Sequence, residues 1–243
     1  MKFFGIITAV YTENDLYTIL KFGVIFRRCS MYGNRKNLVL KDEKSIFIDE
    51  TVFIGDNVTI YENTRIEGKC KICDGAVIYP GCFIKDSIIG EHSTVDASRL
   101  DGAVVEADAS VGPYARLRPG ARIGKGARIG NFVEIKNASI GEGTKVSHLA
   151  YVGDADVGRF CNVGCGAIFV NYDGRSKHRT TVGDNSFIGS NCNVIAPVNI
   201  GKNSYIVAGT TVTSDVSEDD FVIGRVRQEN KPRRAHDYLK EMM

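Results

Sequence analysis

Residues 48–84 read IDETVFIGDNVTIYENTRIEGKCKICDGAVIYPGCFI, and isoleucine stands at every sixth position from Ile48 to Ile84. A helix repeats its buried side every 3.6 residues and a half-buried strand every second residue, so a period of six fits neither alone. The period does fit short strands joined by tight turns, with one large side chain per strand pointing inward. The stretch therefore predicts a solenoid of stacked coils, each built from three short strands.

The same period extends through much of the chain. Two positions before each aliphatic residue there is usually a small or β-branched one, and four of the seven cysteines stand there, where we expect them to be buried packing. Between runs the phase slips by one residue, as at Ile84 to Ile89 and Ile135 to Ile140. The further runs are Val105, Val111, Leu117, Ile123, Ile129 and Ile135, and then Val182, Ile188, Val194, Ile200, Ile206 and Val212.

Composition limits the classes of partner and the compartment. Lys and Arg number 31 against 29 Asp and Glu, a net charge of +2, which gives no reason to expect nucleic acid or an anionic membrane as a partner. The cysteines are scattered, and no paired metal-ligand spacing occurs among them. We therefore expect a reduced, cytoplasmic chain without a metal site. No segment approaches the ~20 apolar residues that would span a bilayer.

The period also divides the chain. Residues 1–43 lie outside the repeat and include TENDLYTILKFG (12–23), which predicts a short helix. Residues 44–214 are predicted to form the solenoid domain, with a loop insertion at 167–181, and residues 215–243 a charged C-terminal arm.

The insertion is the largest irregularity in the repeat. Its core reads FVNYDGRSKHRTT (169–181), and we expect Asn171, Tyr172, Lys177 and His178 to reach outward from it. Loops on a rigid scaffold are where binding groups concentrate. The insertion is therefore a candidate binding element.

Two further clusters of chemically capable residues interrupt the repeat. In the first, His148 stands two residues before Ala150, beside a small corner position, where a neutral imidazole could accept a proton from a reacting amine. In the second, Arg116 and Arg118 stand at alternate positions and could hold a phosphate or a carboxylate.

The period resembles that of the hexapeptide-repeat transferases, and this resemblance implies an all-β, left-handed parallel β-helix. NFVEIK (131–136), HLAYVGDA (148–155) and NYDG (171–174) resemble, in this order, segments of one enzyme family. That family is the bifunctional bacterial N-acetylglucosamine-1-phosphate uridylyltransferase and glucosamine-1-phosphate acetyltransferase, in its acetyltransferase half, and the resemblance runs from about Ile48 to Gln228. It implies a homotrimer with active sites between subunits.

The resemblance also implies a reaction and a set of site residues. Acetyl-CoA would be the co-substrate, with no permanently bound cofactor and no metal, and its acetyl group would pass to the amino group of glucosamine 1-phosphate in UDP-N-acetylglucosamine biosynthesis. His148 would be the general base, Glu134 would orient its imidazole, and the Cys165 backbone N–H would stabilise the oxyanion. The implied sugar-phosphate contacts are Arg118, Lys136, Tyr151, Asn162, Asn171 and Lys177. The implied acetyl-CoA contacts are Cys165, Ser190, Ala208 and Arg225.

Some alternatives remain open at this point. Nothing in residues 1–47 resembles the Gly-rich nucleotide loop of the family's other half, so uridylyltransferase activity is not expected from this chain. The chain could instead acetylate a nucleotide-linked amino sugar, or be a non-catalytic trimeric paralogue. A β-helical carbonic anhydrase is excluded because the four histidines are too far apart to match its ligand spacing.

Overall fold

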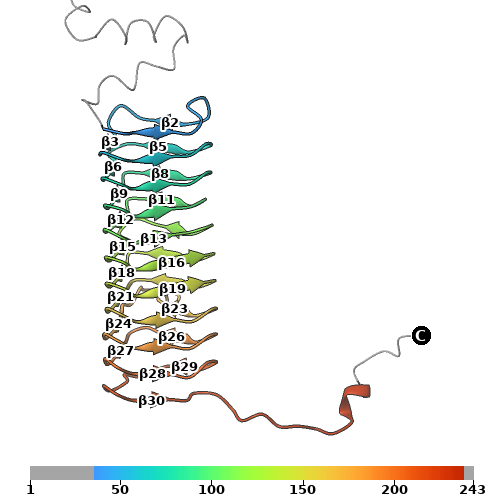
Figure 1. The fold of residues 1–243 in the computed structure, drawn as a ribbon. Coiled ribbons are helices and arrows are strands. Elements are labelled where there is room, and N and C mark those ends of the chain that lie inside the picture. The colour runs from blue at the N-terminus through green and yellow to red at the C-terminus, as the bar shows by residue number, and fades with distance from the viewer. Residues whose placement is uncertain (1–35, 238–243) are drawn as a thin grey trace, which may run out of the picture.

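Residues 36–237 are described by a computed structural model of the chain, and the helix predicted in the N-terminal segment lies outside these residues. Short parallel strands stack into a straight three-sided prism, a left-handed parallel β-helix of about ten turns (Figure 1). Successive strands belong to sheets A, B and C in turn. We call the connections between them the AB, BC and CA turns.

Each sheet runs the length of the prism. Sheet A consists of β1 (Val39–Leu40), β4 (Thr59–Ile60), β7 (Val77–Ile78), β10 (Thr94–Val95), β13 (Ser110–Val111), β16 (Arg128–Asn131), β19 (Lys145–His148), β22 (Asn162–Val163), β25 (Phe187–Ile188), β28 (Tyr205–Ile206) and β30 (Phe221–Val222). Sheet B consists of β2 (Phe47–Ile48), β5 (Arg65–Glu67), β8 (Phe83–Lys85), β11 (Arg99–Asp101), β14 (Arg116–Leu117), β17 (Glu134–Lys136), β20 (Tyr151–Gly153), β23 (Ile168–Val170), β26 (Asn193–Ile195) and β29 (Thr211–Val212).

Sheet C closes the prism on its third side. It consists of β3 (Phe53–Ile54), β6 (Lys71–Ile72), β9 (Ile88–Ile89), β12 (Val104–Val105), β15 (Arg122–Ile123), β18 (Ser139–Ile140), β21 (Ala155–Val157), β24 (Thr180–Val182) and β27 (Val198–Ile200). After β30 the chain leaves the stack and forms a short 3-10 helix, η2 (Arg234–Asp237) (Figure 1).

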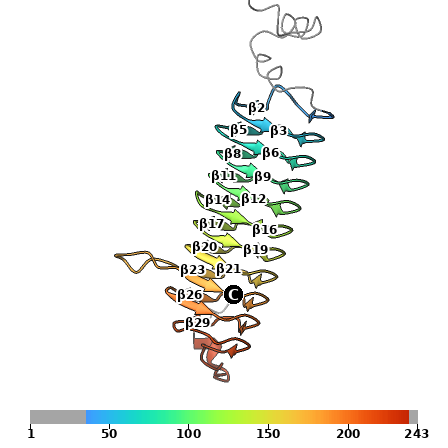
Figure 2. The same cartoon turned by 90° about the vertical axis from the view of Figure 1, so that its left-hand side faces the viewer.

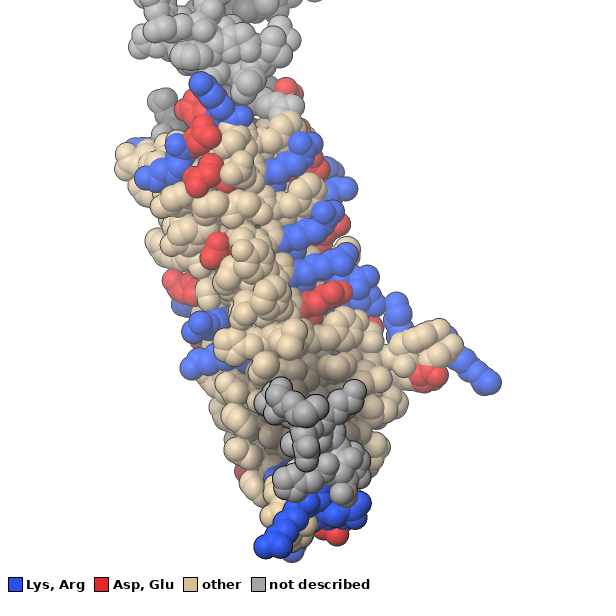
Figure 3. Space-filling view, turned by 90° about the vertical axis from the view of Figure 1, so that its right-hand side faces the viewer, with Lys and Arg blue, Asp and Glu red and all other residues tan. Residues whose placement is uncertain are grey.

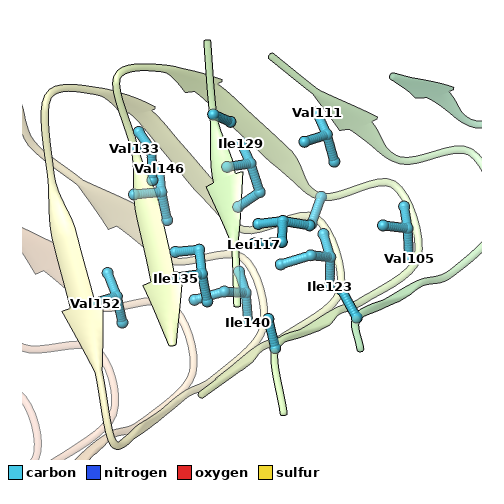
Figure 4. Close-up of a cluster of buried hydrophobic side chains, with 14 of the residues drawn as sticks. Val105, Val111, Leu117, Ile123, Ile129, Val133, Ile135, Ile140, Val146 and Val152 are labelled. Atoms are coloured by element: carbon cyan, nitrogen blue, oxygen red, sulfur yellow. The ribbon is translucent and has the colours of Figure 1, made fainter. Parts of the chain in front are cut away.

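The isoleucine ladder fills the interior, as the period of six predicts. Ile60, Ile66 and Ile72 are fully buried, and the equivalent side chains further along the prism point toward one another between the three sheets (Figure 4). The small position beside each large one is also buried. Four of the described cysteines occupy it, which confirms that they are packing residues: Cys70, Cys82, Cys161 and Cys192. Burial raises the pKa of the Cys82 thiol to about 11.

Variation in coil length concentrates where sheet B passes to sheet C. The one-residue slips from Ile84 to Ile89 and from Ile135 to Ile140 lie at BC turns, since β8 and β17 belong to sheet B and β9 and β18 to sheet C. The long insertion also falls at a BC turn, between β23 and β24. This corner of the prism can change its chain length without disturbing the core, so it is where loops can be added.

Candidate active site at the AB and BC turns

His148 ends β19, and its ring is exposed at an AB turn. Its Nδ1 lies 2.8 Å from the side-chain oxygen of Asn131, which occupies the matching position of β16 one coil earlier. An amide oxygen can only accept, so Nδ1 carries a proton, and in the neutral ring Nε2 is then the nitrogen with the lone pair. Within residues 36–237 Nε2 has no hydrogen-bond partner, and the imidazole therefore presents a proton acceptor to solvent.

The predicted contact between Glu134 and His148 is not present in this chain. Glu134 begins β17 on the outer face of sheet B, and its carboxylate accepts a hydrogen bond from Arg118 at 2.8 Å. His148 lies at the end of a sheet A strand, where Asn131 is its immediate neighbour in the ladder. Asn131 was missed from the sequence, although it stands 17 residues before His148, which is one coil.

Three cationic side chains converge at the BC turns. Lys136 and Lys177 share a hydrogen bond, which raises the pKa of Lys136, and Asp154 adds to the effect. The same bond, with the nearby charges of Lys136 and Arg118, lowers the pKa of Lys177. The cluster holds three cationic side chains against two carboxylates, Glu134 and Asp154, and this excess of positive charge suits it to binding an anion.

Asp154 is the carboxylate within this cluster. Its side chain is 10% exposed and lies 3.5 Å from the Lys136 ammonium, and it accepts hydrogen bonds from the amides of Asn137 and Asn171. Burial alone would raise the pKa of Asp154, but these hydrogen bonds and the charge of Lys136 outweigh burial and hold the pKa below its usual value. Neither Asp154 nor Asn137 was predicted from the sequence as a site residue.

Asn171 does not reach outward as predicted. It is buried, with 8% of its surface exposed, because its amide turns inward to Asp154. The prediction that Asn171 points outward is wrong, because its position in an insertion does not reveal the buried Asp154 carboxylate that its amide bonds. Tyr172, in contrast, is 56% exposed.

The loop of residues 171–179 projects from the prism as a small hairpin (Figure 2). Tyr172 and Lys177 face each other across it in an antiparallel bridge, and Asp173 bonds the His178 ring at 2.8 Å. At the C-terminal end of the loop, Arg179 bonds the Asp156 carboxylate. The loop carries basic and acidic side chains well away from the core, and basic side chains also follow the edge of the prism above it (Figure 3).

The predicted acetyl-CoA residues fall in one column along the AB turns. Cys165, Ser190 and Ala208 each stand two residues after a paired aliphatic residue of sheet A, as His148 does. Adjacent turns are joined by hydrogen bonds of 2.8 Å, from Asn191 N–H to the Cys165 carbonyl and from Gly209 N–H to the Ser190 carbonyl.

The two ends of the column have features of their own. The Cys165 N–H donates to no other group within residues 36–237. A Cβ built on Gly209 would lie 3.4 Å from the Arg225 side chain, so Arg225 adjoins the lower end of the column. The column therefore runs from a free imidazole and a free amide N–H to a cation.

The remaining predicted residues divide between two faces. Tyr151 stands beside Glu134 in sheet B, on the outer face between His148 and the cations. Asn162 lies on sheet A instead, between Lys145 and Phe187, so the structure does not bring it to the cation cluster within one chain.

Among residues 36–237 no group of three or more His, Cys, Asp or Glu is arranged to hold a metal ion. No helix within the described part of the chain is long and apolar enough to cross a membrane.

Comparison with known proteins gives a consistent set of relatives. Residues 51–86, 102–137 and 179–214 match the family profile of bacterial transferase hexapeptide (six repeats). The chain is 46% identical over 207 residues to the bifunctional protein GlmU of Clostridium beijerinckii, covering 85% of this chain and 46% of that protein. It is 43% identical over 234 residues to bifunctional protein GlmU of Carboxydothermus hydrogenoformans, covering 96% of this chain and 52% of that protein.

The chain thus spans about half the length of the curated relatives it matches. Among solved structures, the UDP-N-acetylglucosamine acyltransferase from Campylobacter jejuni superposes with a TM-score of 0.45 at 20% identity. The overlap covers 71% of this chain and 67% of that one.

Proposed function

Because the chain belongs to the hexapeptide-repeat transferases and is homologous to about half of bifunctional GlmU, we propose that it is an acetyl-CoA-dependent N-acetyltransferase acting on an amino sugar. We infer that the acceptor is glucosamine 1-phosphate and the product N-acetylglucosamine 1-phosphate. The proposal covers acetyl transfer alone and places the enzyme in the cytoplasm.

The observation that carries the proposal is the pairing of a proton acceptor with an anion site on one chain. His148 lies at an AB turn, and the cluster of Arg118, Lys136 and Lys177 lies at the BC turns. Sheet B, with Glu134 and Tyr151 on its outer face, separates the two. Glucosamine 1-phosphate carries an amine on C2 and a phosphate monoester on the neighbouring C1, the two groups for which a proton acceptor and a cation cluster are the chemical complements.

The proposed reaction is direct acyl transfer. His148 Nε2 removes a proton from the 2-ammonium group, and the free amine attacks the thioester carbonyl carbon of acetyl-CoA. The Cys165 N–H stabilises the resulting oxyanion. When the intermediate collapses, the C–S bond breaks and the coenzyme A sulfur takes a proton from the imidazolium, while the nitrogen releases its remaining extra proton to solvent to give the neutral amide. Asn131 keeps Nδ1 protonated throughout, and Glu134 orients Arg118 rather than the imidazole.

Acetyl-CoA is proposed to lie along the AB turns as a co-substrate. The small side chains of Ser190 and Ala208 leave room beside the column, and Arg225 supplies a cation for the phosphate groups of the coenzyme at its lower end. This places the thioester near His148 and Cys165, at the upper end.

A homotrimer with sites between subunits is also proposed, and the charge pattern of the edges supports it. From residues 112–114 to residues 207–209, six successive AB turns contain no Lys, Arg, Asp or Glu. The five CA turns that lie between them along the chain carry one charge each: Lys125, Glu142, Arg159, Asp184 and Lys202. Charge depletion with aromatic enrichment is typical of the core of a protein interface.

Exposed apolar side chains lie on this same edge. Tyr114, Phe132 and Leu149 occupy consecutive AB turns, are about 60% exposed and have positive φ, a backbone conformation that is unfavourable for large side chains. Tyr114 and Phe132 stack with ring centroids 5.6 Å apart. If Tyr114, Phe132 and Leu149 are buried between copies, a neighbouring subunit would lie beside the acetyl-CoA column.

Release of coenzyme A from acetyl-CoA tests the acceptor. Purified protein is assayed with glucosamine 1-phosphate, with a UDP-linked amino sugar and with free glucosamine. We expect kcat/KM to be highest for glucosamine 1-phosphate, since only it presents a terminal phosphate dianion to the three cations. A higher kcat/KM for the UDP-linked sugar would contradict the acceptor assignment. Release with none of the three would contradict the enzymatic function itself.

A further inference from the structure

Asp154 is the one charged residue that is buried among residues 36–237. A buried carboxylate is costly unless donors satisfy it, because it loses its hydration. Three donors surround this one: the amides of Asn137 and Asn171 and the ammonium of Lys136. The other buried polar side chains in this part of the chain are hydroxyls and one amide, so the prism has no general need for an internal charge.

The three donors come from two different levels of the prism. Lys136 and Asn137 belong to the coil that precedes Asp154, while Asn171 begins the projecting loop on the coil that follows. Asp154 is itself held at the BC turn, where its N–H donates to the Lys136 carbonyl at 3.0 Å and its carbonyl accepts from Thr180 N–H at 3.1 Å. The carboxylate therefore ties the root of the loop to the strand that carries Lys136.

Both lysines of the cation cluster depend on this tie. Lys136 contacts the carboxylate directly. Lys177 is reached through Asn171, whose carbonyl accepts a hydrogen bond of 2.8 Å from His178 N–H, the residue next to Lys177. The bridge between Tyr172 and Lys177 then fixes the hairpin above that point.

We propose that Asp154 is a positioning residue. Its buried carboxylate bonds both Lys136 and Asn171, at the base of the loop, and so holds Lys136 and Lys177 next to each other. The expected effect on substrate binding rests on the proposed function, whereas the expected effect on the loop does not. Asp154 needs no contact with substrate to act in this way, since Asn171 and Lys136 cover it.

The kinetic test replaces Asp154 by Asn and uses Asp184→Asn as the matched control. Asp184 is a half-buried acid at a CA turn whose carboxylate bonds Arg159, so its variant makes the same chemical change away from the cluster. We expect Asp154→Asn to raise KM for glucosamine 1-phosphate about 10–100-fold, the scale for losing a hydrogen bond to a charged group. The KM for acetyl-CoA should stay within about twofold, because the AB column is on another corner. Asp184→Asn should leave both values unchanged.

A pH profile separates positioning from simple damage. The titratable groups around Lys136 and Asp154 are Lys177, Tyr151, Arg118 with its partner Glu134, and Arg179 with its partner Asp156. Loss of the Asp154 carboxylate makes these surroundings more positive, so the lysines give up protons more readily. The alkaline rise of KM for the sugar phosphate should therefore move to lower pH in Asp154→Asn and stay in place in Asp184→Asn.

Limited trypsin digestion tests the tie without any substrate. The loop offers cleavage after Arg175 and Lys177, and we expect this cleavage to be several-fold faster in Asp154→Asn than in the unaltered chain or in Asp184→Asn. Asn171→Ala cuts the tie from the loop side, and we expect it to accelerate cleavage while leaving the alkaline limb of KM near its original pH. If Asp154→Asn does not fold, the cleavage rate of Asn171→Ala decides the structural claim.

The outcomes separate the tie from the proposed function. Faster cleavage of Asp154→Asn, in a protein whose unaltered form shows no acetyl transfer, would sustain the tie and overturn the proposed function. Unchanged cleavage and unchanged KM in a folded Asp154→Asn would overturn the positioning role. An equal rise in KM for both substrates, with a lowered melting temperature, would also overturn it and leave only a structural role.

Discussion

At the scale of single residues, the chemistry of His148 depends on a neutral amide. Asn131 accepts from Nδ1, so the ring is held in the tautomer that leaves Nε2 free, and no carboxylate contacts it within the described chain. The amide therefore fixes the orientation of the imidazole and directs Nε2 toward solvent.

The protonation state of Lys177 gives a pH-dependent prediction. Its hydrogen bond with Lys136, together with the charges of Lys136 and Arg118, lowers its pKa in the empty site. A phosphate dianion that binds between these cations favours the charged form and raises the pKa again. Binding should therefore take up protons, with an uptake that is absent well below the lowered pKa and grows as pH rises toward it.

Calorimetry in two buffers of different ionisation enthalpy measures this uptake. The titration uses glucosamine 1-phosphate at about pH 8 or above, where the monoester is already a dianion. Lys177→Arg is the control, because a guanidinium stays charged in the empty site and has no proton to gain. Identical binding enthalpies in the two buffers for the unaltered chain would contradict the prediction.

At the scale of elements, the turns decide where each functional group stands. Asn131 ends β16 and lies beside His148 at the AB turn, where Gly130 allows the next coil to approach closely. A Cβ at Gly130 would lie far inside van der Waals contact of the Ser147 carbonyl oxygen, which is backbone and cannot rotate away. The close approach of these two coils is therefore a condition of the site.

Gly130→Ala should destabilise the chain and disturb the base. We expect a loss of about 2–3 kcal/mol in the free energy of unfolding, as for overpacking at a rigid site, together with a reduced kcat. Gly126→Asn is the control. Gly126 has φ of 63° with nothing within 4 Å of an added Cβ, and asparagine adopts the same left-handed conformation at Asn185 and Asn203. Denaturant unfolding of the two variants compares them, and equal stabilities would refute the packing argument.

The strands were predictable from the sequence and the side-chain partners were not. A six-residue period can be satisfied only by one large inward side chain per short strand, so the spacing of Ile60, Ile66 and Ile72 is enough to identify the core. The hydrogen-bond partner of Glu134 could not be predicted in the same way. It depends on which face and which turn the residues of the two neighbouring coils occupy. Asn171 turned inward for the same reason, toward a carboxylate that the repeat pattern does not reveal.

At the scale of the whole molecule, the three edges of the prism differ in charge. The BC edge bears the cations and the loop, the CA edge bears a charge at every coil, and the AB edge is uncharged over six coils. A charge placed on the AB edge should therefore weaken association between copies, whereas the same charge on the CA edge should not.

Phe132→Glu and Phe160→Glu form a matched pair for this prediction. Both phenylalanines are nearly 60% exposed with positive φ, but Phe132 stands on the AB edge and Phe160 on the CA edge, next to Arg159. Light scattering should give three times 26.6 kDa for the unaltered chain and for Phe160→Glu, and a lower mass for Phe132→Glu. A single-chain mass for the unaltered protein would contradict the trimer.

Acetyl transfer with His148 as the base is the central proposal for this chain. Mass spectrometry can detect N-acetylglucosamine 1-phosphate formed from acetyl-CoA and glucosamine 1-phosphate, by the unaltered chain and by His148→Ala. We expect product from the unaltered chain and a kcat about 10²–10⁴-fold lower in His148→Ala, the usual contribution of a general base, with KM for both substrates little changed. Equal kcat values for the two proteins, or no product from the unaltered chain, would contradict this role.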